Sequence, residues 1–114
     1  MVVRGGTRTL SDAHLGNQVG DCWERHRFFG VSVFGAPGDD LVTLGHSVRA
    51  IRIRPVIRVT RCGSLRAAGF EVSATFPNPF HYSVVLPDAS PATFELLRGC
   101  FGSAGPNPGY EPET

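Results

Sequence analysis

Glycine and proline interrupt this chain so often that only short helices and strands can form. The 114 residues include 14 glycines and nine prolines, and both residue types end regular structure. Between these interruptions, residues 2–4, 28–34, 51–60, 70–76 and 81–86 read as strands, most of them with polar and apolar residues alternating. We therefore expect an α+β fold with a single small mixed sheet of about five short strands.

Two segments carry the helical spacing of apolar residues instead. Ser11 or Asp12 can cap a longer N-terminal helix whose apolar residues recur at Leu15, Val19 and Trp23. Ser90-Pro91 starts a C-terminal helix that ends near residue 101. We predict one domain over residues 1–101, followed by an extended or disordered tail over residues 102–114, which is rich in glycine and proline.

Charge, hydropathy and cysteine content argue against a generally basic nucleic-acid-binding protein, a membrane-spanning protein and a disulfide-rich protein. The formal net charge of +1 gives no global reason to bind nucleic acid. No apolar run approaches the roughly 18 residues of a membrane span, and from the first residues we expect no signal peptide. The odd, widely spaced Cys22, Cys62 and Cys100 are typical of free thiols in a reducing cytoplasm. Lysine is absent beside abundant arginine, alanine, glycine and proline, which indicates a bacterial genome of high GC content.

Arginine is concentrated in one part of the chain. Six of the eleven arginines lie between Asp40 and Glu71, a stretch without a carboxylate. If residues 51–60 form one strand, Arg52, Arg54 and Arg58 share a face and can bind the phosphates of RNA or another anion. Pro55 suggests an edge strand or a bulge, and the alternative for an edge strand is that these charges are solvated and prevent edge-to-edge aggregation.

Three other groups of residues deserve a chemical interpretation. His81 and Tyr82 begin a strand and can handle protons, as metal-independent RNA cleavage requires, although a core tyrosine beside a histidine at a sheet end is the alternative. Arg4-Gly5-Gly6 either leaves the backbone open to a ligand or forms a plain turn. Asp21, Glu24 and His26 lack metal-ligand spacing, so we predict no metal.

No nucleotide-binding or nucleophile motif occurs. The hydroxyls of Ser32, Ser73 and Ser83 have no indicated base, so the sequence does not support a serine or cysteine hydrolase.

Taken together, the size, the α+β order, the arginine segment and the late His81-Tyr82 resemble the toxin component of a bacterial toxin–antitoxin pair. Resemblance to endoribonuclease toxins implies that Arg52, Arg54 and Arg58 hold RNA and that His81 and Tyr82 are catalytic, without a cofactor. Resemblance to ADP-ribosyltransferase-like toxins implies an NAD site instead, formed by Arg4, Ser32 and Glu71.

Three functions follow as hypotheses for a cytoplasmic protein. The first is binding of RNA or another anionic ligand, with metal-independent RNA cleavage as one form of it. The second is an ADP-ribosyltransferase-like reaction that uses NAD. The third is a non-catalytic protein-interaction module that docks an acidic partner, such as an antitoxin tail, with no membrane partner in any of the three.

Overall fold

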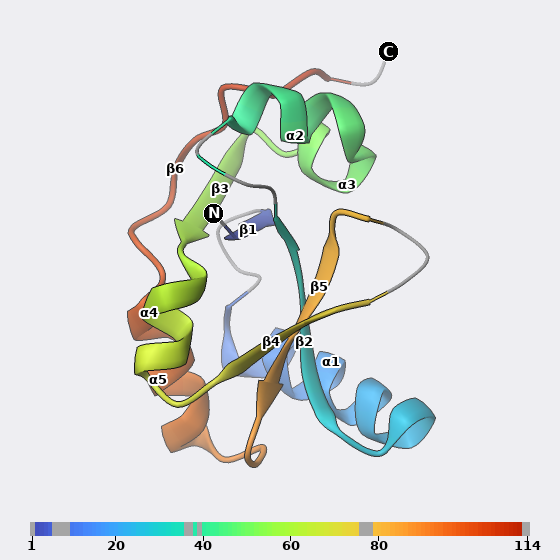
Figure 1. Ribbon diagram of the computed structural model, residues 1–114, viewed down its shortest axis with the longest axis vertical. Coiled ribbons are helices and arrows are strands. Elements are labelled where there is room, and N and C mark those ends of the chain that lie inside the picture. Colours follow the sequence, from blue (N-terminus) through green and yellow to red (C-terminus); the bar gives the residue numbers. More distant parts are fainter. Residues whose placement is uncertain (1, 6–9, 36–37, 39, 76–78, 113–114) are drawn as a thin grey trace.

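The computed structural model describes residues 2–5, 10–35, 38, 40–75 and 79–112. Its strands are β1 (Val2–Gly5), β2 (Phe29–Gly35), β3 (Val56–Thr60), β4 (Glu71–Ala74), β5 (His81–Leu86) and β6 (Gly105–Pro106). Its helices are α1 (Asp12–His26), α2 (Leu41–Ser47), α3 (Arg49–Arg52), α4 (Cys62–Ala67) and α5 (Pro91–Cys100). Figure 1 shows α2 and α3 at one end of the molecule and α1, α4 and α5 at the other.

The strands form one sheet in the order β4-β5-β2-β1-β3-β6, which confirms the predicted α+β class. The sheet is not mixed, because every strand pair in the described residues is antiparallel. Two strands joined by a helix are often parallel neighbours. Here α1 joins β1 to β2, and the two strands are antiparallel. The sixth strand is the two-residue β6, which lies beyond the predicted C-terminal boundary.

Local capping explains where the longer helices begin. The Ser11 side chain accepts a hydrogen bond from the backbone N–H of His14, and the Ser90 side chain accepts one from Thr93, ahead of Pro91. Both caps and both helices agree with the sequence prediction. Trp23 is an exception within α1, because 40% of its surface is exposed and its ring stacks on Phe29 with centroids 4.7 Å apart.

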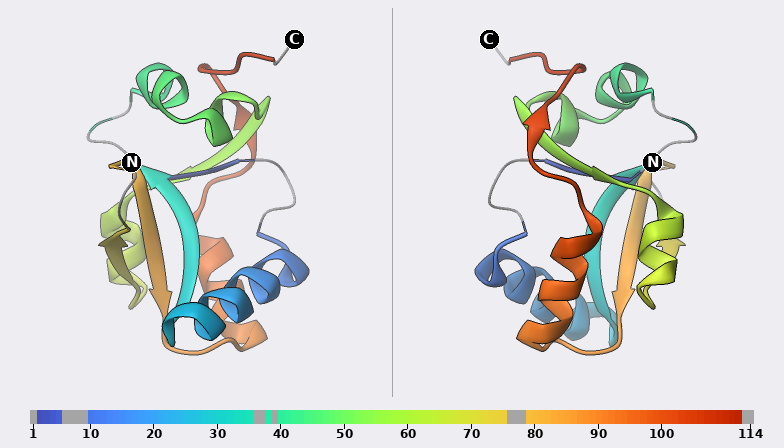
Figure 2. Two further views of the ribbon diagram at one scale, coloured as in Figure 1. Left: turned by 90° about the vertical axis from the view of Figure 1, so that its right-hand side faces the viewer. Right: turned by 90° about the vertical axis from the view of Figure 1, so that its left-hand side faces the viewer.

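Two hydrophobic clusters lie on opposite faces of the sheet. The larger cluster joins α1, α4 and α5 to the face that carries Val31, Val33 and Val84. The smaller cluster joins α2 and α3 to β3 through Leu44, Val48, Ile51 and Ile57, with Phe34 packed against it. Figure 2 shows from two sides that α2 and α3 lie apart from α1, α4 and α5. The smaller cluster therefore covers only one end of its face of the sheet.

The predicted arginine strand over residues 51–60 is wrong in its first half. Residues Arg49–Arg52 form helix α3, and only Val56–Thr60 form β3. The alternation around Ile51 also fits a helix, because Leu44, Val48 and Ile51 are spaced at i, i+4 and i+7 and are buried together. Nor is β3 an edge strand along its whole length, since β6 pairs with its residues Val56 and Ile57.

The C-terminal segment is extended, and it is packed rather than a free tail after residue 101. Asn107 is buried, and its side-chain nitrogen donates to the carbonyl oxygens of Ile51 and Arg54 at 2.9 and 2.8 Å. Gly45 and Gly109 allow the segment to approach α2, because a Cβ atom on Gly45 would lie 2.9 Å from the Gly109 oxygen. The packed structure thus extends past the predicted domain boundary.

Two further observations concern the cysteines and the predicted lack of a membrane span. Cys22, Cys62 and Cys100 are free thiols. None of the helices described is long and apolar enough to cross a membrane.

Candidate functional site

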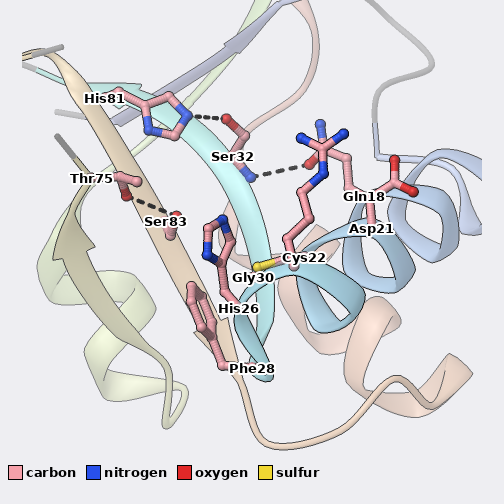
Figure 3. A pocket seen from close by; sticks show the side chains of 11 residues that line it. Gln18, Asp21, Cys22, His26, Phe28, Gly30, Ser32, Thr75, His81 and Ser83 are labelled. Atoms are coloured by element: carbon pink, nitrogen blue, oxygen red, sulfur yellow. Dashed lines mark hydrogen bonds between the residues drawn. The ribbon is translucent and has the colours of Figure 1, made fainter. Parts of the chain in front are cut away.

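A pocket opens beside β2 and β5 (Figure 3). Gly30 and Ser32 of β2 lie on the face of the sheet opposite Val31 and Val33, away from the larger cluster. The C-terminal half of α1 forms the opposite wall, and the cavity volume is about 250 Å³. We call it the Ser32 pocket; its lining residues are Gln18, Asp21, Cys22, Arg25, His26, Phe28, Gly30, Ser32, Thr75, His81 and Ser83.

At one side of this pocket a serine and a histidine are hydrogen-bonded. Ser32 Oγ and His81 Nε2 are partners, although the two residues are 49 positions apart in the chain. The register between β2 and β5 brings them together, because Phe34 pairs with His81 and Ser32 with Ser83. A hydroxyl beside an unprotonated imidazole nitrogen is the arrangement that activates a serine as a nucleophile.

The surroundings of His81 keep its imidazole neutral. Burial lowers the pKa of His81, and a hydrogen bond with the backbone of Thr75 offsets part of this effect. The Thr75 N–H also donates to the His81 carbonyl oxygen at 3.0 Å, and the His81 ring packs edge-on against Phe34. A neutral, oriented imidazole at neutral pH is suited to accept a proton.

Beside Ser32, β2 has lost its pairing with β1, and side chains bind the backbone groups of β2 instead. β1 and β2 pair at only two positions. Beyond them the Ser32 backbone N–H donates to Gln18 Oε1 at 3.1 Å, and Arg4 Nη1 donates to the Ser32 carbonyl oxygen at 2.5 Å. Arg4 Nη1 also lies 3.0 Å from Gln18 Oε1 as a donor. Gln18 and Arg4 therefore satisfy the strand backbone that β1 leaves unpaired.

Arg4 is a buried cation. Its exposed fraction is 5%, and burial lowers the pKa of its guanidinium to about 10. The side chain remains charged at neutral pH, and its Nη1 donates to Gln18 Oε1 and to the Ser32 carbonyl oxygen. Arg4 therefore acts behind the pocket, and it is not among the residues that line it.

Gly30 is the floor of the pocket. A Cβ atom at this position would lie 2.6 Å from Phe28 Cε2 and 2.8 Å from Cys22 Sγ. Both distances are too short for real Cβ contacts, so a larger residue would displace the side chains that form the wall. The absence of a side chain at Gly30 is thus a condition for this shape of pocket.

The structure brings together residues that the sequence assigned to different sites. His81 of the predicted nuclease site and Ser32 of the alternative NAD site line the same pocket, with Arg4 directly behind Ser32. Tyr82 lies on the opposite face and packs against the larger cluster. Glu71 is exposed on β4 and does not line the pocket.

The three predicted phosphate-binding arginines do not share one strand face. Arg52 belongs to α3, and its Nη1 donates to the His46 carbonyl oxygen at 3.3 Å. Arg54 lies between α3 and β3. Arg58 is directly opposite Arg4 in the β1–β3 pair, and its buried Nε has no hydrogen-bond partner among the described residues. None of the three lines the Ser32 pocket.

Sequence reasoning missed Gln18, Arg25, Phe28 and Gly30 as pocket residues, and it found no base for Ser32. No local signal identifies these residues, because α1 and β2 meet through packing. The strand pattern did carry part of the signal, since it places Ser32 on the face opposite Val31 and Val33.

Within the described residues, no three histidine, cysteine, aspartate or glutamate side chains are grouped so that they could hold a metal ion. Comparison of the chain with protein-family models, with curated proteins and with solved structures found no match.

Proposed function

We propose that the Ser32 pocket is a hydrolytic site in which Ser32 is the nucleophile and His81 is its general base. The observation that carries this proposal is the hydrogen bond between Ser32 Oγ and His81 Nε2 at an open cavity. The lowered pKa of His81 supports it, because the imidazole is then the free base at neutral pH. The edge-on packing of the His81 ring against Phe34 supports a fixed ring orientation.

The reaction proceeds in two halves. His81 Nε2 takes the hydroxyl proton as Ser32 Oγ bonds to the carbonyl carbon of an ester, and the leaving alcohol then receives that proton as its bond to the carbonyl carbon breaks. His81 next takes a proton from a water molecule as its oxygen bonds to the acyl carbon on Ser32, and His81 then returns that proton to Ser32 Oγ as the bond from Oγ to the acyl carbon breaks and the acid leaves. The cavity volume of about 250 Å³ suits a small acyl group beside Phe28 and Cys22.

Covalent labelling tests this proposal directly. We expect an uncharged fluorophosphonate probe to modify Ser32, identified by peptide mass spectrometry, because the probe reacts with serines that have an adjacent base. Ser32→Ala abolishes labelling, and His81→Asn slows it at least about a hundredfold. Ser73→Ala is the matched control, because Ser73 is exposed on β4 and does not line the pocket. A folded wild-type protein that leaves Ser32 unlabelled would contradict the proposal.

A second candidate is metal-independent cleavage of RNA in the same pocket. It is favoured by His26 and Arg25, which line the cavity together with His81. His81 would take the proton of a ribose 2′-hydroxyl as its oxygen attacks the adjacent phosphorus. His26 would then protonate the departing 5′-oxygen, and Arg25 would hold the phosphate.

The two candidates differ in their need for Ser32. Cleavage of a short single-stranded RNA in the presence of EDTA would survive Ser32→Ala and would be lost in His81→Asn, whereas ester hydrolysis requires both residues. Replacing the 2′-hydroxyl at one position with hydrogen should block cleavage there. RNA that remains intact at all protein concentrations would refute the second candidate. An NAD-using transferase has less support, since Glu71 lies outside the pocket.

A further inference from the structure

The carboxamide of Gln18 is held in one orientation. Its Oε1 accepts hydrogen bonds from the Ser32 backbone N–H at 3.1 Å and from Arg4 Nη1 at 3.0 Å. Both partners are only donors, so the oxygen and the nitrogen of the amide cannot exchange places without losing two bonds. The two N–H groups of Gln18 Nε2 therefore point away from Arg4 and the Ser32 backbone.

Gln18 Nε2 is also available to a ligand. Gln18 lines the Ser32 pocket, and its nitrogen has no acceptor among the described residues. It is not one of the fully buried polar atoms that lack a partner, so solvent reaches it in a residue that lines the pocket. An oriented donor that is not used by the protein, next to a nucleophile, is what an oxyanion site requires.

The charge of Arg4 strengthens this donor. Arg4 as a residue is 5% exposed, so little solvent screens the effect of its charge on the amide that it contacts. A cation bound to the oxygen of an amide withdraws electron density and makes the N–H groups better donors. The same contact holds the amide in place before any substrate arrives, so no reorganisation is needed during the reaction.

We propose that Gln18 Nε2 donates a hydrogen bond to the negatively charged oxygen that forms when Ser32 adds to a carbonyl group, and that Arg4 is the positioning residue for Gln18. This inference rests on the proposed function of the Ser32 pocket. It makes a stretch of α1 part of the catalytic apparatus, with Ser32 supplying the attacking oxygen and His81 receiving the proton.

Gln18→Glu separates this role from a structural one. A carboxylate keeps both acceptor contacts, to Ser32 and to Arg4, but it has no N–H group and is negative. We expect the variant to remain folded with an unchanged or higher melting temperature. Its kcat for p-nitrophenyl acetate and its rate of fluorophosphonate labelling at Ser32 should fall about 10²- to 10³-fold, with KM changed much less. Asn17→Asp, on an exposed position of α1, is the matched control for the charge change.

The possible outcomes distinguish a failure of the proposed role of Gln18 from a failure of the proposed hydrolytic site at Ser32. Wild-type protein that labels at Ser32, together with a Gln18→Glu variant that labels at the same rate, would overturn the role of Gln18 alone. Wild-type protein that does not label at Ser32 would overturn the hydrolytic site and this inference with it. Gln18→Ala serves as a second variant, because it loses the donor without adding a negative charge; an unchanged rate in this folded variant would also overturn the role.

Discussion

Replacing Asn107 with alanine should destabilise the whole domain, although Asn107 lies in a segment with the composition of a tail. The side chain is 6% exposed and takes part in three hydrogen bonds. Its nitrogen donates to the Ile51 and Arg54 carbonyl oxygens at 2.9 and 2.8 Å, and its oxygen accepts from the Gly109 N–H at 3.0 Å. The Ile51 carbonyl oxygen belongs to α3 and also accepts from the Arg54 N–H, whereas the Arg54 carbonyl oxygen lies in the connection between α3 and β3.

The expected loss follows from these three bonds. A buried hydrogen bond contributes about 0.5–1.5 kcal/mol net, so the free energy of unfolding should fall by about 3 kcal/mol in Asn107→Ala. That is a large fraction of the roughly 5–15 kcal/mol that stabilises a typical domain. For a chain of this length each kcal/mol lowers the melting temperature by about 4 °C, so we expect a drop of about 12 °C.

Urea denaturation followed by circular dichroism measures this loss, and Asn107→Asp sharpens the result. Aspartate keeps the acceptor for Gly109 but cannot donate to the two carbonyls, so it should destabilise the protein at least as much as alanine does. If both variants unfold within about 0.5 kcal/mol of the wild type, the segment is not docked in solution. The domain would then end near residue 101, and the reasoning from these contacts would be refuted.

Four other predictions concern substitutions at single positions. Gly20→Ala should stabilise α1 by about 0.5–1 kcal/mol in urea denaturation, because nothing lies within 4 Å of its added Cβ atom, whereas Gly30→Ala should cost about 1–3 kcal/mol through its clash with Phe28. The pKa of His81 is lowered in the folded state, so the unfolded chain binds more protons. Stability should therefore fall as the pH drops below about 6.5, and ester hydrolysis should fall at lower pH, where the folded protein protonates His81. His81→Asn should remove this part of the pH dependence of stability. Arg98→Ala should cost about 1 kcal/mol, less at high salt, because its guanidinium binds Asp12 at 2.6 Å near the surface.

The elements that could be predicted are those with local signals at their ends. Ser11, Ser90 and Pro91 mark the starts of α1 and α5, and residues 81–86 form β5 as expected. These signals lie within a few residues of the structure that they specify, so no knowledge of the rest of the chain is needed. The segment around Ile51 has no such signal, and its pattern of apolar residues is compatible with a strand and with a helix. Packing of Ile51 against Leu44 and Val48 favours the helix.

The candidate site illustrates the same limit. Ser32 and His81 could each be identified as chemically able residues, but in different hypotheses, because 49 positions separate them. Their partnership depends on the register between β2 and β5, and a shift of one residue would move each side chain to the other face. Tyr82, the neighbour of His81, is on that other face and packs against the larger cluster.

By itself, the sequence determined that this chain forms short elements in an α+β domain, and which face of each strand is apolar, because both properties follow from local pattern. The tertiary structure alone decided that the sheet is antiparallel, that the arginines at 52, 54 and 58 are dispersed, and that residues 102–112 pack against the domain. It also decided that β1 leaves β2 after two pairs, so that Gln18 and Arg4 complete the backbone at Ser32. Strand register and the packing of distant segments arise from contacts between residues far apart in the chain, and no local pattern encodes them.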